Sequence, residues 1–183
     1  LSFVDAACLP TAWLTAYRML TTRAQVQPGQ TVLVQGVGGG VSTAAIQLAH
    51  LLGARVWATS RDGAKRAAAL ELGAEAAFEP GARLPERVDA VMESVGEATW
   101  AHSLKSLKPG GRLVVCGATS GPNPPADLSR VFFLQLSILG STMGTLDELI
   151  DLVSLVDRTG VRPTVSATYD LADARAGFEQ LAS

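Results

Sequence analysis

The sequence has 183 residues, of which 48% are hydrophobic, 17% charged and 5% aromatic, and its formal net charge is −2. This length suits one domain, and the apolar content excludes an intrinsically disordered chain. No excess of basic residues marks a nucleic-acid-binding surface, and no apolar run approaches the roughly 20 residues of a membrane-spanning helix. We therefore expect neither nucleic acid nor a membrane as a partner.

The first predicted element is helical. Apolar side chains recur at helical spacing over Asp5–Thr22, interrupted by Pro10, which predicts one helix or two short ones. Thr31–Gln35 is a β-branched apolar run, typical of a buried parallel strand. Val41–Leu52 follows as a helix with few charges, and Gly53 ends it as a C-cap glycine does.

The same alternation continues to the end of the chain. The pattern predicts strands at Arg55–Thr59, Ala76–Phe78, Val88–Glu93, Arg112–Cys116 and Leu136–Gly140, with Val165–Thr168 extended. It predicts helices at Asp62–Leu72, Glu97–Leu107, Asp127–Leu134, Leu146–Arg158 and Leu171–Leu181. Alternating strands and helices indicate an α/β fold with a doubly wound parallel sheet, helices on both faces, and a single domain over residues 1–183.

A glycine-rich turn joins the first predicted strand to its helix. Gly36 ends the strand, and Gly38, Gly39 and Gly40 open the helix that begins at Val41. Glycines let a pyrophosphate approach the backbone, and the helix N-terminus offers unpaired N–H groups. Val41 or Ser42, depending on the register, stands where the dinucleotide fingerprint has its third glycine. The turn predicts a nucleotide site.

The end of the second strand distinguishes between the two nicotinamide cofactors. NAD sites place an acid there, on the ribose hydroxyl, whereas this sequence has Ser60 and Arg61, with Lys65 one turn further on. Both cations could pair with a 2′-phosphate. Asp62 could serve as the acid, but we expect it to cap the following helix. NADP(H) is therefore the predicted cofactor, in preference to NAD(H).

Several segments together resemble the cofactor domain of the medium-chain dehydrogenase/reductase superfamily, which contains zinc alcohol dehydrogenases and quinone oxidoreductases. The matching segments span nearly the whole chain: Ala6–Tyr17, Pro28–Val34, the glycine turn with Ala44–Ala49, Leu107–Val114 and Ile138–Met143. The resemblance implies hydride transfer between NADP(H) and a carbonyl, quinone or activated alkene. It also implies a homodimer formed through the edge strand Leu136–Met143.

The resemblance also implies a role for individual residues. Thr15 would lie beside the nicotinamide, while Gly39, Gly40 and Val41 would cradle the pyrophosphate. Ser60, Arg61 and Lys65 would hold the adenosine phosphate. Backbone at Ser94, Val95, Gly117, Ala118 and Thr119 would line the ribose and the carboxamide. None of these residues is assigned as a catalytic acid or base.

Zinc is not expected. Thr11 stands where zinc-bearing relatives have a cysteine ligand, and Cys8 is almost one helical turn away. We expect Cys8 and Cys116 to be buried apolar residues, and His50 and His102 to face solvent. The two cysteines and the absence of a signal peptide in this sequence favour the cytoplasm.

The start at Leu1, without Met, suggests that the substrate domain and a C-terminal return segment lie outside this chain. We therefore expect these residues alone to bind the cofactor weakly and to turn over no substrate. Two other functions remain open. One is an AdoMet-dependent methyltransferase, which also has a glycine turn after its first strand. The other is a non-enzymatic nucleotide-binding or dimerisation domain.

Overall fold

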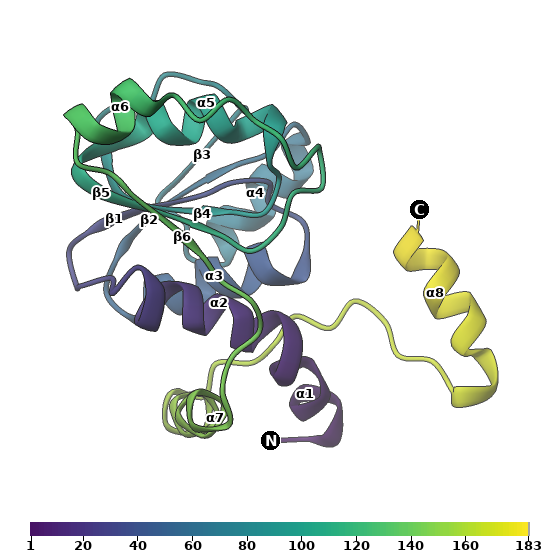
Figure 1. Cartoon of the computed structure of the whole chain (residues 1–183). Coiled ribbons are helices and arrows are strands. Elements are labelled where there is room, and N and C mark those ends of the chain that lie inside the picture. The colour runs from purple at the N-terminus through teal and green to yellow at the C-terminus, as the bar shows by residue number, and fades with distance from the viewer. Residues whose placement is uncertain (183) are drawn as a thin grey trace.

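The computed structural model describes residues 1–182 and contains a six-stranded parallel sheet (Figure 1). Its strands are β1 (Thr31–Val34), β2 (Arg55–Thr59), β3 (Ala76–Phe78), β4 (Val88–Glu93), β5 (Leu107–Val115) and β6 (Ser137–Gly140). Their order across the sheet is β3-β2-β1-β4-β5-β6. The predicted doubly wound α/β fold is confirmed, and the strand order reverses between β1 and β4, where ligands of such sheets bind.

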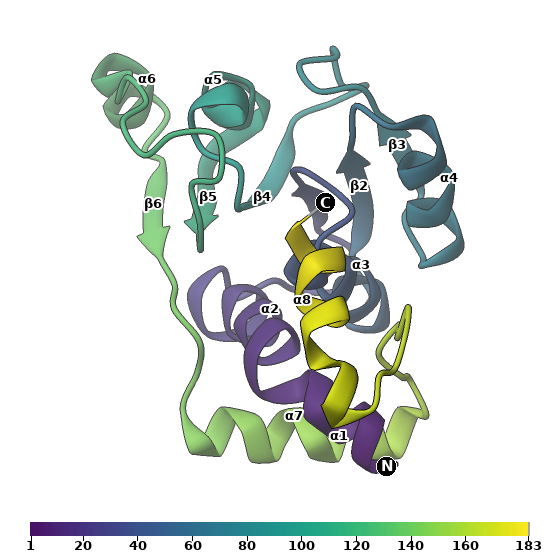
Figure 2. The same cartoon turned by 90° about the vertical axis from the view of Figure 1, so that its right-hand side faces the viewer.

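Helices cover both faces of the sheet, and the central strands are accordingly rich in buried apolar side chains (Figures 1 and 2). One face carries α3 (Gly40–Leu51), α4 (Gly63–Glu71) and the N-terminal helical segment, and α7 (Leu146–Thr159) packs on the outer side of that segment (Figure 2). The other face carries α5 (Glu97–Ser106) and α6 (Leu128–Phe133). Both hydrophobic layers are well buried, with Ile46 and Leu113 inaccessible to solvent.

The N-terminal segment is one uninterrupted run of helix. It comprises α1 (Phe3–Cys8), η1 (Leu9–Trp13), α2 (Leu14–Arg18) and η2 (Met19–Arg23), where η1 and η2 have π-helical hydrogen bonding. Pro10 stands at the start of η1. Proline lacks an N–H and collides with the preceding turn, and a wider turn accommodates it without breaking the helix.

One predicted boundary is wrong. Leu107 was expected to end a helix, but it adopts an extended conformation and begins β5, five residues before the predicted Arg112. Leu107 pairs with Val88, and the pairing register then shifts by a bulge before Arg112 meets Ala90. The Gly110 N–H donates to the carbonyl of Leu134, which holds the bulged segment of β5 against the end of α6. The contact depends on residues far apart in the sequence.

The C-terminal segment stands away from the sheet (Figure 1). After α7, residues 160–170 form no strand, so the extended segment predicted at Val165–Thr168 joins no sheet. A short 3-10 turn, η3 (Leu171–Asp173), and helix α8 (Ala174–Ala182) follow. Leu171 and Phe178 are 92% and 73% exposed, so this segment contributes little to the core.

Candidate functional site

A hollow of about 520 Å³ opens at the carboxyl ends of β1, β2 and β4, where the strand order reverses. It is lined by the turns that follow these strands and by the loop that follows β5. The lining residues are Gly36, Val37, Ser60, Arg61, Asp62, Lys65, Pro80, Val95, Ala98, Thr99, Thr119 and Ser120. Predicted positions from four separate turns thus meet at one cavity.

The glycine turn has the conformation that its sequence predicts. Gly36 and Gly38 have φ angles of 71° and 131°, which side chains rarely adopt. A methyl group on Gly36 would stand 2.4 Å from Cγ2 of Val95, so the turn after β4 packs directly on the turn after β1. Gly39 is the N-cap of α3, and its N–H donates to Oγ of Ser42 at 3.2 Å.

Lys65 lies across the glycine turn. A methyl group on Gly38 would be 2.7 Å from Cδ of Lys65 and 3.1 Å from Nζ. The ammonium group therefore lies beside the turn that would hold a pyrophosphate. Sequence spacing had grouped Lys65 with Arg61 on the adenosine phosphate, and only the folded chain shows which of the two faces the glycines.

Arg61 stands at the rim of the hollow with its guanidinium free. It is exposed, and within residues 1–182 it makes no hydrogen bond or ion pair. Asp62, by contrast, is engaged as the N-cap of α4, with Oδ1 accepting from Ala64 N at 2.7 Å and Lys65 N at 3.3 Å. Capping by Asp62 is confirmed, and it leaves Arg61 as the unpaired charge at the end of β2.

Arg66 is a residue that the sequence reading missed. Its guanidinium donates to the carbonyl of Ser60 at 2.7 Å and lies 3.6 Å from Glu79. Arg66 thereby holds the turn that presents Ser60 and Arg61. Arg61, Lys65 and Arg66 are three cations within six residues, and the sequence does not indicate which of them faces the cavity and which supports the backbone.

The two remaining predicted loops pack on each other. The Ser94 carbonyl accepts from Thr119 N at 3.3 Å, and the Val95 carbonyl accepts from Ser120 N at 2.7 Å. A methyl group on Gly117 would stand 3.1 Å from the Ser94 carbonyl oxygen. Gly117 and Ala118 line a neighbouring shallow hollow with Arg18, Arg23 and Ser141 rather than the main cavity.

Thr15 does not reach the cavity. It is 7% exposed within α2 and lines none of the hollows described above. Val41 and Ser94 instead border a void of about 10 Å³ beside Met19 and Cys116, too small for a ligand. The structure therefore brings the predicted residues to one edge of the sheet but distributes them over several surfaces.

The cysteine and histidine expectations are partly wrong. Cys8 and Cys116 are free and only half-buried. Burial, followed by the charge of Glu93, raises the pKa of the Cys116 thiol, which makes it a poor nucleophile at neutral pH. His50 is exposed as expected, whereas His102 is half-buried, with its ring nitrogens 3.0 Å from Gln35 Nε2 and 2.9 Å from the Ala82 carbonyl.

The side chains around Thr11 do not fit a zinc ion. Thr11 is itself exposed, and no three His, Cys, Asp or Glu side chains gather in a metal-binding arrangement within residues 1–182. Structural or catalytic zinc needs such a group of ligands. Over the same residues, no helix is long and apolar enough to cross a membrane.

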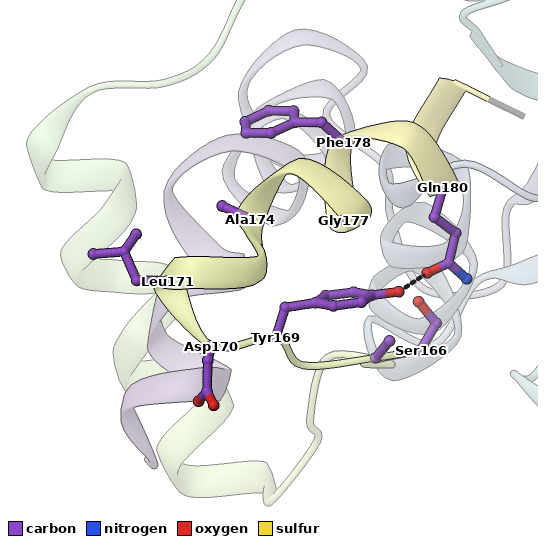
Figure 3. A pocket seen from close by; sticks show the side chains of 9 residues that line it. Ser166, Tyr169, Asp170, Leu171, Ala174, Gly177, Phe178 and Gln180 are labelled. Carbon is purple, nitrogen blue, oxygen red and sulfur yellow. Dashed lines mark hydrogen bonds between the residues drawn. The ribbon is translucent and has the colours of Figure 1, made fainter.

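A further hollow of about 510 Å³ lies in the C-terminal segment, far from the strand ends (Figure 3). Tyr169 and Phe178 flank it, and the Tyr169 hydroxyl donates to the side-chain oxygen of Gln180. Its walls come from α8 and the residues just before it. It contains none of the predicted positions and no basic side chain, so the hollow at the strand ends is the candidate nucleotide site.

Comparison with known proteins identifies the family of the chain. The sequence profile of zinc-binding dehydrogenases matches residues 40–158. The spectinabilin polyketide synthase system protein NorB of Streptomyces orinoci is 32% identical over 99% of this chain and 9% of its own length. The acryloyl-coenzyme A reductase of Metallosphaera sedula is 32% identical over 96% of this chain and 54% of its own length.

Among solved structures, the 2-octenoyl-CoA carboxylase reductase CinF, in complex with NADP and 2-octenoyl-CoA, superposes with a TM-score of 0.89. It is 28% identical to the chain and is matched over 96% of the chain and 46% of its own. The chain thus spans about half the length of these reductases, and a much smaller part of the polyketide synthase protein.

Proposed function

The chain belongs to the zinc-binding dehydrogenase family, and from this premise we propose that it binds NADP(H) for hydride transfer to an activated alkene. The observation that carries the cofactor choice is the free guanidinium of Arg61 at the end of β2. An NAD site has a carboxylate at this position, and here the nearest one, on Asp62, already caps α4. CinF, which was solved with NADP, supports the same choice.

The residues of the hollow fit a dinucleotide phosphate. The first-turn N–H groups of α3 and the ammonium of Lys65 would hold the pyrophosphate beside Gly38. Arg61 would pair with the 2′-phosphate, and Val95 and Thr119 would form the wall against the ribose. These groups would bind the phosphates and orient the cofactor along the edge of the sheet.

When bound, the reduced nicotinamide would supply the hydride. No step is assigned to a zinc ion, because the donor set described above does not fit one. The acryloyl-CoA reductase and the CinF complex both favour an alkene conjugated to a thioester as the substrate class. A carbonyl or a quinone is the alternative acceptor, and a substrate panel with NADPH decides among the three.

We also propose that two copies associate through β6. Among residues 1–182, this strand is the last of the sheet and pairs only with β5. Ile138 on β6 is 40% exposed, and Phe132 and Phe133 on the neighbouring α6 are 61% and 77% exposed. An unpaired strand edge beside exposed aromatic rings favours strand addition by a second copy.

The cofactor proposal is tested by titrating the chain with NADPH, NADH and AdoMet under identical conditions. We expect NADPH to bind at least about tenfold more tightly than NADH. The reason is that a charge-assisted hydrogen bond from Arg61 to the 2′-phosphate contributes enough binding free energy for that factor. Tighter binding of AdoMet would establish the methyltransferase alternative. Equal binding of NADPH and NADH would remove the role assigned to Arg61.

A further inference from the structure

Behind the candidate site lies a buried carboxylate that the proposed function does not use. Glu93 is the last residue of β4 and is 0% exposed. Its Oε1 accepts from Val95 N at 2.8 Å, Gly96 N at 3.2 Å and Thr99 Oγ1 at 2.9 Å. Its Oε2 accepts from Thr99 Oγ1 at 2.9 Å and Ser103 Oγ at 2.6 Å. Both oxygens of this carboxylate thus accept hydrogen bonds.

These hydrogen bonds fix the turn that follows β4. Two backbone N–H groups of the turn point at one carboxylate oxygen, so Glu93 determines the path of residues 94–96. Gly96 has a φ of 93°, and a methyl group there would stand 2.4 Å from the Gly121 carbonyl oxygen. The turn is therefore packed closely against the loop that follows β5.

The anchored turn touches both neighbouring walls of the hollow. Val95 packs on Gly36 of the glycine turn, and the Val95 carbonyl accepts from the Ser120 N–H and hydroxyl, each at 2.7 Å. Displacing this turn would move Val95 out of the cavity wall and release the loop that carries Ser120.

The same carboxylate is connected to the other strands. Gln35 Nε2 donates to Ser103 Oγ at 3.0 Å, and Gln35 Oε1 accepts from Thr59 Oγ1 at 2.5 Å. Gln35 precedes the glycine turn and Thr59 ends β2, so one buried polar network joins the ends of three strands. Buried polar groups of this kind are costly to leave partly satisfied, which makes the arrangement rigid.

We propose that Glu93 is a positioning residue for the dinucleotide. Through the turn at 94–96 it sets the distance between the glycine turn and the Thr119–Ser120 wall. The proposal rests on the function proposed above. It makes Glu93 act through the backbone rather than by touching the cofactor.

The test uses the full chain with three variants on this network and one matched control. Glu93→Leu removes all acceptors, whereas Glu93→Gln keeps one oxygen for the two backbone N–H groups. Ser103→Ala removes the 2.6 Å donor, while Ser106→Ala removes a buried hydroxyl of the same helix that bonds only to the His102 carbonyl. NADPH affinity and amide hydrogen exchange are measured on each folded variant.

We expect Glu93→Leu to weaken NADPH binding at least about tenfold and Ser103→Ala about threefold, with Glu93→Gln recovering most of the loss. Hydrogen exchange without cofactor should accelerate at Val95, Gly96 and Ser120 and stay unchanged in α7. Should Glu93→Leu not fold, the Ser103→Ala and Ser106→Ala pair carries the comparison. Equal effects of those two alanine variants on affinity and exchange would overturn the proposal.

The two readouts separate this proposal from the proposed function. If the unaltered chain binds no NADPH, the cofactor proposal fails and the positioning of that cofactor fails with it. If the chain binds NADPH but the Glu93 and Ser103 variants leave affinity and exchange unchanged, only the positioning role is refuted.

Discussion

Replacing Arg61 by alanine tests the cofactor assignment at a single side chain. The guanidinium is exposed and has no partner within residues 1–182, so its removal leaves no buried group unpaired and should not change the stability of the fold. A hydrogen bond to a charged group contributes about 1.5–3 kcal/mol, and exposure places Arg61 at the lower end. We therefore expect NADPH affinity to fall about tenfold, since about 1.4 kcal/mol corresponds to that factor.

The assay is fluorescence titration of NADPH and NADH at two ionic strengths. NADH affinity should change by less than about twofold, because NADH lacks the 2′-phosphate that a charge-assisted bond would hold. Arg87→Ala is the control, since Arg87 is exposed and precedes β4 at the opposite end of the sheet. Equal losses for NADPH and NADH in Arg61→Ala would refute the reasoning, as would an equal NADPH loss in the control.

Three further predictions follow from other parts of the structure. Gly38→Ala should destabilise the fold by about 1–3 kcal/mol and weaken NADPH binding, because a φ of 131° disfavours a side chain and the methyl group displaces Lys65; unchanged urea unfolding would contradict this. Burial raises the pKa of Glu148, but hydrogen bonds from Thr22, the Thr145 N–H and Arg18 outweigh it, so the pKa lies below 4.5. The stability that Glu148 contributes is therefore present above pH 4.5 and is lost as the pH falls through the lowered pKa. Glu148→Gln should reduce this loss of stability at acidic pH, as measured by denaturation at a series of pH values. A variant whose stability depends on pH as the unaltered chain does would contradict the role of Glu148. Ile138→Lys should convert a dimer to a monomer in light scattering, and a variant that stays dimeric would place the interface elsewhere.

Much of the fold was predictable because local chemistry determines it. The bounds of β2, β3 and β4 agree with the prediction, since each is a short run rich in apolar residues between polar or turn-forming segments. Pro10 and Leu107 were harder. The helix continues through Pro10 by widening locally to a π-helical turn, and the early start of β5 depends on pairing with Val88, far away in the sequence.

The candidate site was predicted in outline and not in detail. The glycine turn and the cationic end of β2 have sequence signals, and the structure brings them to one cavity. The position of Lys65 over Gly38 and the network around Glu93 have none, because they depend on tertiary contacts between strand ends. Gln35 and Glu93 do stand out as polar residues at the carboxyl ends of β1 and β4, but their partners cannot be identified from the sequence.

The most direct test of the central claim is a calorimetric titration of the 183-residue chain with NADPH, NADH and AdoMet, followed by an assay for NADPH oxidation with an enoyl thioester. We expect binding of NADPH in preference to NADH, no binding of AdoMet, and no turnover by these residues alone. Preferred binding of NADH or AdoMet would contradict the cofactor assignment. Measurable turnover would contradict the expected inactivity of these residues alone.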